Sequence, residues 1–146
     1  MNTEQLLIPR YEVIADYPDS SFSVGQIIKF ELLKTGDWVY RWAKHDGIYE
    51  MSLIEFKEYP HLFKPLPWYH GRKIEEMPEY VKWNSSGNVS KVLDTIVSHT
   101  NGLLMLKTNE VSQPDNRPVA NYCPVYWFTP ALESDYIAFI NREKNE

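Results

Sequence analysis

Alternation of apolar and polar residues predicts short β-strands along most of the first half of the chain. Residues 11–15 alternate, residues 25–33 are rich in Ile, Phe and Leu, and residues 38–45 and 48–53 alternate on either side of Asp46-Gly47. An Asp-Gly pair between two alternating runs is typical of a type I′ β-hairpin. We therefore expect a hairpin that turns at these two residues.

The predicted hairpin has one aromatic face. With Asp46 and Gly47 in the turn, the expected pairs are His45 with Ile48, Ala43 with Glu50, Trp42 with Met51 and Tyr40 with Leu53. One face then carries Trp38, Tyr40, Trp42, Tyr49, Met51 and Leu53, while Arg41 and Glu50 meet diagonally on the other. Burial of the aromatic face would contribute roughly 1.5–3 kcal/mol per large side chain. We favour a buried face over an exposed platform that stacks on bases, sugars or a peptide.

Turn residues and prolines divide the rest of the chain. Residues 17–21 predict a turn, and residues 60–69 form a proline-rich and aromatic link that we expect to be a packed strap rather than a flexible linker. Further strands are expected at 77–83, 88–98, 103–107 and 122–128, with a polar loop at 109–121.

Two short helices are predicted from capping signals. Ser52 followed by Glu55 is a capping-box pattern and predicts a helix near residues 52–63. Thr129 followed by Pro130 predicts the start of a helix near residues 129–141. On that second helix one face, expected to dock on the sheets, carries Leu132, Tyr136, Phe139 and Ile140.

A faint internal repeat suggests two related halves. Gly25 precedes an apolar strand and Gly87 precedes another, with lysine matching lysine, and the segment 58–63 resembles 135–140. We predict a β-rich α+β fold of two small SH3-like or otherwise barrel-like halves, residues 1–70 and 71–146, in one compact body with a short helix ending each half. A single β-sandwich would give similar local patterns.

Composition and charge exclude several classes of protein. The chain has 146 residues, of which 43% are hydrophobic and 14% aromatic, so it can bury a sizeable core. Its net charge of −5 argues against sequence-independent binding to the phosphate backbone of nucleic acid. No apolar run approaches the roughly 20 residues that span a bilayer, and a single cysteine, Cys123, fits a reducing compartment. We expect a cytoplasmic protein with no membrane partner, or a virion component.

The sequence contains no recognisable catalytic or metal-binding motif. The four histidines, His45, His61, His70 and His99, lack the helical spacing typical of metal ligands, and Cys123 precedes a proline inside an apolar run that indicates a buried thiol. We therefore predict no metal and no cofactor. An enzyme without a recognisable motif stays an alternative, and it would need a deep pocket that gathers His61 or His70 with Glu58 or Arg72.

Three segments carry a resemblance to known sequences. Tyr17–Gly25, Tyr59–Trp68 and Met77–Lys82 are similar to segments of small uncharacterised proteins encoded by phages and prophages of Bacteroidetes-type gut bacteria. That group has no settled activity, so the resemblance implies a phage or mobile-element setting and assigns no catalytic residue. In such a setting an inhibitor of host defence or a virion part is expected.

The preferred hypothesis is a non-catalytic protein-binding module of phage or mobile-element origin. It would act as an inhibitor, an adaptor or a virion component, and its partner would be a host or phage protein. The chain could also form a homo-oligomer. An alternative is a small-barrel binder of a nucleotide, single-stranded nucleic acid or glycan. The candidate binding residues are Trp38, Arg41, Trp42, Trp68, Tyr69 and Arg72.

Overall fold

The computed structural model describes residues 3–16, 22–44, 46–110 and 121–144. The predicted turn at 17–21, His45 with its predicted pairing to Ile48, and most of the predicted loop at 109–121 lie outside these residues. The fold is β-rich α+β, which confirms the predicted class. The chain divides into a first unit, Ile8–Trp68, and a second unit, Met1–Leu7 with Tyr69–Glu146. That the two pack as one compact body stays a prediction.

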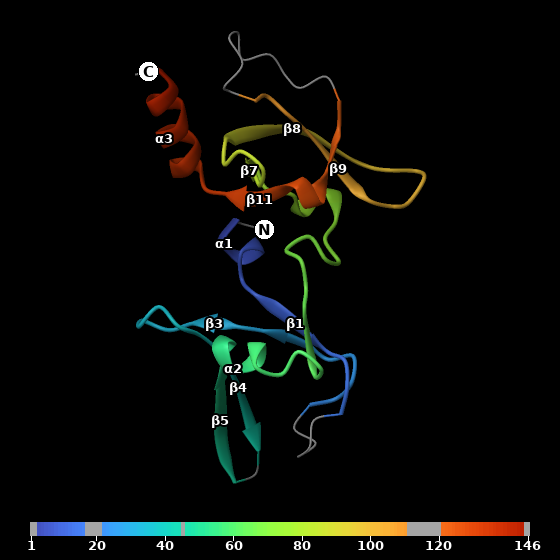
Figure 1. Cartoon of the computed structure of the whole chain (residues 1–146), viewed down its shortest axis with the longest axis vertical. Helices are drawn as coiled ribbons and strands as arrows, with labels where there is room; N and C mark the ends of the chain where they lie inside the picture. The colour runs from blue at the N-terminus through green and yellow to red at the C-terminus, as the bar shows by residue number, and fades with distance from the viewer. Residues whose placement is uncertain (1–2, 17–21, 45, 111–120, 145–146) are drawn as a thin grey trace. The chain divides into compact units, whose positions relative to one another are not determined.

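The first unit consists of two small sheets that share one bent run of chain (Figure 1). Its elements are β1 (Arg10–Val13), β2 (Ile27–Lys29), β3 (Glu31–Leu32), β4 (Trp38–Lys44), β5 (Gly47–Ser52), α2 (Leu53–Lys57) and β6 (Phe63–Pro65). The sheets have the orders β2-β1-β6 and β3-β4-β5, and only Phe30 separates β2 from β3. A strand that bends from one sheet into the next forms the corner of a small barrel. The strand order is that of an SH3-like barrel.

The hairpin β4–β5 confirms the predicted strands and faces but corrects their register. Trp42 pairs with Tyr49 and Tyr40 with Met51, so the predicted pairs of Trp42 with Met51 and Tyr40 with Leu53 are wrong. The cause is Gly47, which has φ +144° and lies in β5 opposite Lys44, instead of in the turn. Because the pairing shifts by an even number of residues, the side chains of β4 and β5 keep their predicted faces, whereas Leu53 lies in α2.

Helix α2 supplies the central ring of the first core. The predicted capping box is present: Glu55 N–H donates to Ser52 Oγ at 3.2 Å, and Ser52 N–H donates to Glu55 Oε1 at 3.5 Å. Phe56 is fully buried and, among the described residues, contacts the rings of Tyr11, Phe22, Phe30, Tyr40 and Phe63. The prediction that this helix ends the first half is wrong, because β6 follows the helix and pairs with β1.

The second unit contains a five-stranded antiparallel sheet with the order β10-β9-β8-β7-β11. Its elements are α1 (Thr3–Leu6), η1 (Ile74–Glu76), β7 (Tyr80–Trp83), β8 (Val89–Val97), β9 (Leu104–Thr108), β10 (Cys123–Pro124), η2 (Val125–Trp127), β11 (Phe128–Ala131) and α3 (Glu133–Lys144). Strand β8 pairs first with β7 and then with β9, and its register shifts between Val92 and Asp94.

The two units share one connectivity. In the first unit, β1 pairs with β2 and with the last strand, β6, and the short helix α2 precedes β6. In the second unit, β7 pairs with β8 and with the last strand, β11, and the short helix η2 precedes β11. In both units the second strand bends and continues into a second set of pairings, β3 with β4 and β8 with β9. Gly25 and Gly87, with φ of +91° and +78°, precede the corresponding strands β2 and β8. The other predicted match is wrong, because 58–63 leads into β6 whereas 135–140 lies within α3, which has no counterpart. Descent from a duplicated sequence stays a prediction.

The last helix begins later than predicted. Thr129 and Pro130 lie in β11, where they pair with Lys82 and Val81, so they do not cap a helix. Proline is tolerated there because β11 is an edge strand. Helix α3 begins at Glu133, and the Asp135 carboxylate accepts a hydrogen bond from Leu132 N–H at 3.0 Å. Of the predicted docking face, Phe139 is buried and Tyr136 packs beside it, while Leu132 is exposed.

Candidate functional site

The aromatic face of the hairpin packs largely against the core of the first unit. Trp38, Tyr40 and Trp42 are half-buried, and Trp42 stacks between Tyr40 at 5.7 Å and Tyr49 at 5.8 Å. The outermost ring, Tyr49, is exposed, and its hydroxyl donates to Asp46 Oδ2 at 2.5 Å. Two predicted binding residues, Trp38 and Trp42, therefore present little free ring surface.

Arg41 lies on the other face of the hairpin. Its Nε donates to Glu50 Oε1 at 2.8 Å, and Glu31 Oε1 lies 3.6 Å away. The hydrogen bond that Arg41 donates to Glu50, followed by the charges of both carboxylates, raises the pKa of Arg41. The structure therefore does not bring Arg41 together with the tryptophans that were predicted to act beside it, because successive residues of a strand point to opposite faces.

The remaining predicted residues lie at the boundary of the units. Trp68, the last residue of the first unit, is half-buried, and its carbonyl accepts a hydrogen bond from the Arg10 guanidinium at 3.2 Å. Tyr69 is also half-buried, and Arg72 is 3.7 Å from Glu76 in an ion pair. None of these three residues is without an interaction partner, and none lines a hollow described below.

Exposed aromatic residues gather instead in the second unit. Trp83, Asn84, Ser85, Tyr126 and Trp127 line a hollow of about 360 Å³, which we call the aromatic hollow. Tyr126 is 52% exposed and Trp127 is 48% exposed, and both lie on the short helix η2. Neither the Tyr126 hydroxyl nor the Trp127 indole N–H makes a hydrogen bond with the residues that the structure describes.

Asn84 fixes this arrangement. Its N–H donates to the Trp127 carbonyl at 2.9 Å, its Nδ2 donates to the Tyr126 carbonyl at 3.2 Å, and its Oδ1 accepts from Thr129 Oγ1 at 2.6 Å. The end of β7 is thereby tied to η2. Trp83, which also lines the hollow, is held by an edge contact with Phe128 at 4.5 Å and donates a hydrogen bond from its Nε1 to Ser90 Oγ at 3.0 Å. The hollow is therefore preformed.

A second hollow of the same unit is acidic. Glu4, Glu75, Glu79 and Glu133 are among the residues that line its 520 Å³. Burial raises the pKa of Tyr80 in this hollow, and the charges of Glu133 and Glu79 raise it further. Within the described ranges, however, no three His, Cys, Asp or Glu side chains gather as they would around a metal ion.

Cys123 is buried on β10, and burial raises the pKa of its thiol, with a further contribution from the Glu110 carboxylate. A raised pKa suppresses the thiolate, which is the nucleophilic form. No helix among the described residues is long and apolar enough to cross a membrane.

Comparisons with models of protein families, with curated proteins and with solved structures found no match to this chain.

The aromatic hollow was not predicted from the sequence. Tyr126 and Trp127 lie inside the apolar run 122–128, which predicts a strand with half of its side chains buried. The structure breaks that run at η2, so that these two neighbouring rings are both exposed. The signal in the sequence was the run of three adjacent aromatic residues, Tyr126, Trp127 and Phe128, two residues after Pro124.

Proposed function

We propose that this chain is a non-catalytic protein-binding module, and that the aromatic hollow of the second unit holds an extended, apolar or proline-containing segment of the partner. The observation that carries the proposal is the exposure of Tyr126 and Trp127 side by side, next to Trp83. Tyrosine and tryptophan are the residues that most often anchor protein–protein interfaces, because they bury large area at a small cost in side-chain freedom.

The polar groups around the hollow favour a peptide over a compact polar ligand. Beside the three aromatic residues only two polar residues among those described, Asn84 and Ser85, line the hollow, and part of the Asn84 amide is engaged with Tyr126 and Thr129. Small-molecule sites generally need several such convergent groups. The Tyr126 hydroxyl and Trp127 N–H, at the ends of apolar rings, are instead suited to the carbonyl groups of an extended peptide, as in aromatic grooves that bind proline-rich segments.

We further propose that the partner is a host or phage protein, which is what the resemblance of the sequence to phage-encoded proteins implies. An inhibitor, an adaptor and a virion component would each use such a surface. The competing hypothesis, a binder of nucleotides, single-stranded nucleic acid or glycans, uses the same exposed rings for stacking, and it predicts a different ligand in the same assay.

Selection from a random peptide library tests the proposal. Peptides selected on the wild-type protein should share a proline or apolar motif, and they should bind Trp127→Ala about tenfold or more weakly, because truncating an anchor costs on the order of 2 kcal/mol. Tyr59→Ala removes a ring of similar exposure, 37%, from the first unit and should leave affinity unchanged.

Two results would contradict the proposal. One is a selection that yields no shared motif, or peptides that bind Trp127→Ala as tightly as the wild type. The other is tight binding of an oligothymidylate or a glycan that is lost in Trp127→Ala, which would support the stacking hypothesis instead.

A further inference from the structure

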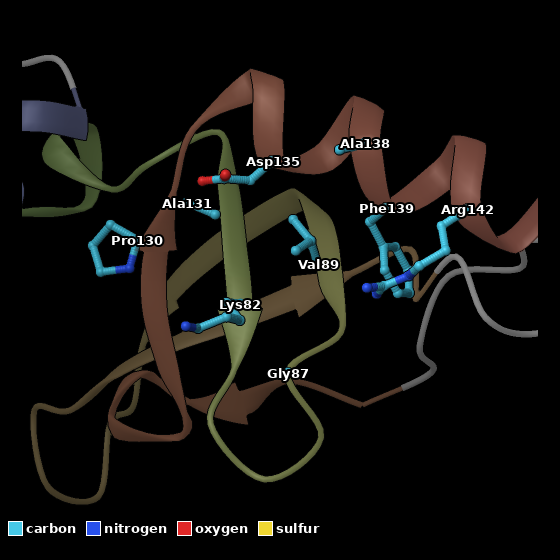
Figure 2. Close-up of a pocket in the computed structure, with 9 residues that line it drawn as sticks. All are labelled: Lys82, Gly87, Val89, Pro130, Ala131, Asp135, Ala138, Phe139 and Arg142. Carbon is cyan, nitrogen blue, oxygen red and sulfur yellow. The ribbon is translucent and has the colours of Figure 1, made fainter.

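A third hollow of the second unit lies between helix α3 and the sheet (Figure 2). It has a volume of about 410 Å³ and is lined by Lys82, Gly87, Val89, Pro130, Ala131, Asp135, Ala138, Phe139 and Arg142. We call it the basic hollow, because two of its three charged side chains are cations. This volume falls within the roughly 300–1,000 Å³ of typical ligand sites.

The two cations are available to a ligand. Lys82 makes no ion pair and no side-chain hydrogen bond with the described residues, and it is exposed on β7. The Arg142 guanidinium lies over the Phe139 ring at 5.3 Å and has no ion pair within the described part of the chain. Its N–H donors are therefore free for an anion. Both cations occur on a chain whose net charge is −5, so their presence in one hollow is not a consequence of a basic surface.

The third charged residue, Asp135, has a structural role. Its carboxylate accepts the hydrogen bond from Leu132 N–H that begins α3. The hollow therefore contains two positive charges and one negative charge. Asp135 lies near the start of α3, whereas Arg142 lies toward the other end of the helix (Figure 2). A negatively charged group is therefore expected near Arg142 and away from Asp135.

The wall of the hollow is apolar. Val89, Ala131 and Phe139 form one buried cluster, each less than one-tenth exposed, and Ala138 and Pro130 extend it. A simple inorganic anion would use the cations of the hollow but not this wall. A ligand that fits both features has an apolar group joined to an anion, and the planar guanidinium of Arg142 matches the two oxygens of a carboxylate.

We infer that the basic hollow binds an apolar carboxylate, with the carboxylate on Arg142, the apolar group on Val89, Ala131 and Phe139, and Lys82 adding a second positive charge to the hollow. This chemistry occurs in free hydrophobic acids and in the C-terminal residue of a protein chain. The site is separate from the aromatic hollow and does not depend on the function proposed for it.

Titration of the full chain with N-acetyl-leucine and with its uncharged amide tests this inference, with binding followed by amide chemical shifts in ¹H–¹⁵N NMR. We expect the acid to shift Val89, Ala131 and Phe139 and to bind about tenfold or more tightly than the amide, because a charge-assisted hydrogen bond is lost with the carboxylate. A longer peptide that ends in leucine binds more tightly than the acid if the natural ligand is a chain terminus, and equally if it is a free acid.

Charge variants locate the carboxylate. Arg142→Gln and Lys82→Gln should each weaken binding of N-acetyl-leucine, with about a tenfold loss for Arg142→Gln. Lys91→Gln makes the same change of net charge at an exposed position of β8 outside the hollow and should have little effect. Asp135→Asn keeps an acceptor for Leu132 N–H but removes the negative charge, so affinity should rise or stay unchanged.

Two ligand results would overturn the inference: equal affinity for the acid and the amide, and an affinity for inorganic phosphate as high as that for the acid. Two variant results would also overturn it. One is an equal loss of affinity in Lys91→Gln and Arg142→Gln, and the other is a loss of affinity in Asp135→Asn, which would indicate a cationic group on the ligand. All four variants lie at exposed positions, and unchanged thermal unfolding would show that they fold.

Discussion

At the scale of single residues, the environment of each aromatic ring separates rings that pack in the core from rings that are open to a ligand. Trp38 and Trp42 were predicted to bind a ligand, but they pack on the core around Phe56, and Trp42 Nε1 is buried without a hydrogen-bond partner among the described residues. Trp127 has the opposite environment, since its ring is half exposed on a turn that Asn84 holds in place. Composition alone cannot distinguish these tryptophans, because the exposure of a ring depends on whether the backbone directs it toward the core or toward solvent.

Cys123 offers a prediction at this scale. Because burial and Glu110 raise its thiol pKa, less thiolate is present at a given pH than for an ordinary thiol. We expect iodoacetamide at about pH 8.5, near the usual thiol pKa, to alkylate the folded protein much more slowly than the chain unfolded in urea. The rate for the folded protein should continue to rise with pH above that value.

Glu110→Gln is the matched control for the cysteine. It removes the carboxylate charge and leaves the burial of Cys123 in place, so the pH midpoint of alkylation should move down while the rate stays below that of the unfolded chain. A folded protein that is alkylated as fast as the unfolded chain would show that the thiol is neither buried nor suppressed.

At the scale of elements, local patterns predicted strands well and their ends less well. The period-two alternation of residues 38–53 specified the faces of the β4–β5 hairpin, but the register depended on the backbone of Gly47, which the sequence does not reveal. Thr129-Pro130 is compatible with a helix start and with an edge strand, and pairing with β7 decides for the strand. The capping box at Ser52 was predictable because both of its hydrogen bonds are local.

That capping box gives the prediction at this scale. Ser52→Ala removes the acceptor for Glu55 N–H, and we expect a loss of about 0.5–2 kcal/mol in the free energy of unfolding, measured by urea denaturation. Ser134→Ala makes the same chemical change at an exposed position inside α3, where alanine is the better helix former, so it should not destabilise the protein. Equal losses in both variants would contradict the role of Ser52 as a cap.

At the scale of the whole molecule, the β-rich class was predictable from strand and turn patterns, and the shared connectivity of the two units was indicated in the sequence by Gly25, Gly87 and the strands that follow them. Both glycines precede the bent strand and have positive φ, a conformation that glycine adopts without strain. The segments 58–63 and 135–140 suggested a further match by composition, but one leads into a strand and the other forms a helix. The repeat therefore lies in how the strands connect, and most of it leaves no mark on residue identity.

The central claim is that partner binding involves the aromatic hollow of the second unit and not the aromatic face of the hairpin. The five tryptophans test this directly, because each has its own indole N–H resonance in a ¹H–¹⁵N spectrum: Trp83 and Trp127 line the hollow, while Trp38, Trp42 and Trp68 belong to the first unit. On titration with a peptide selected on the wild-type protein, we expect the Trp127 resonance to shift most and that of Trp83 to follow, with the other three nearly unchanged. Shifts centred on Trp38 and Trp42, with Trp127 unaffected, would contradict the account.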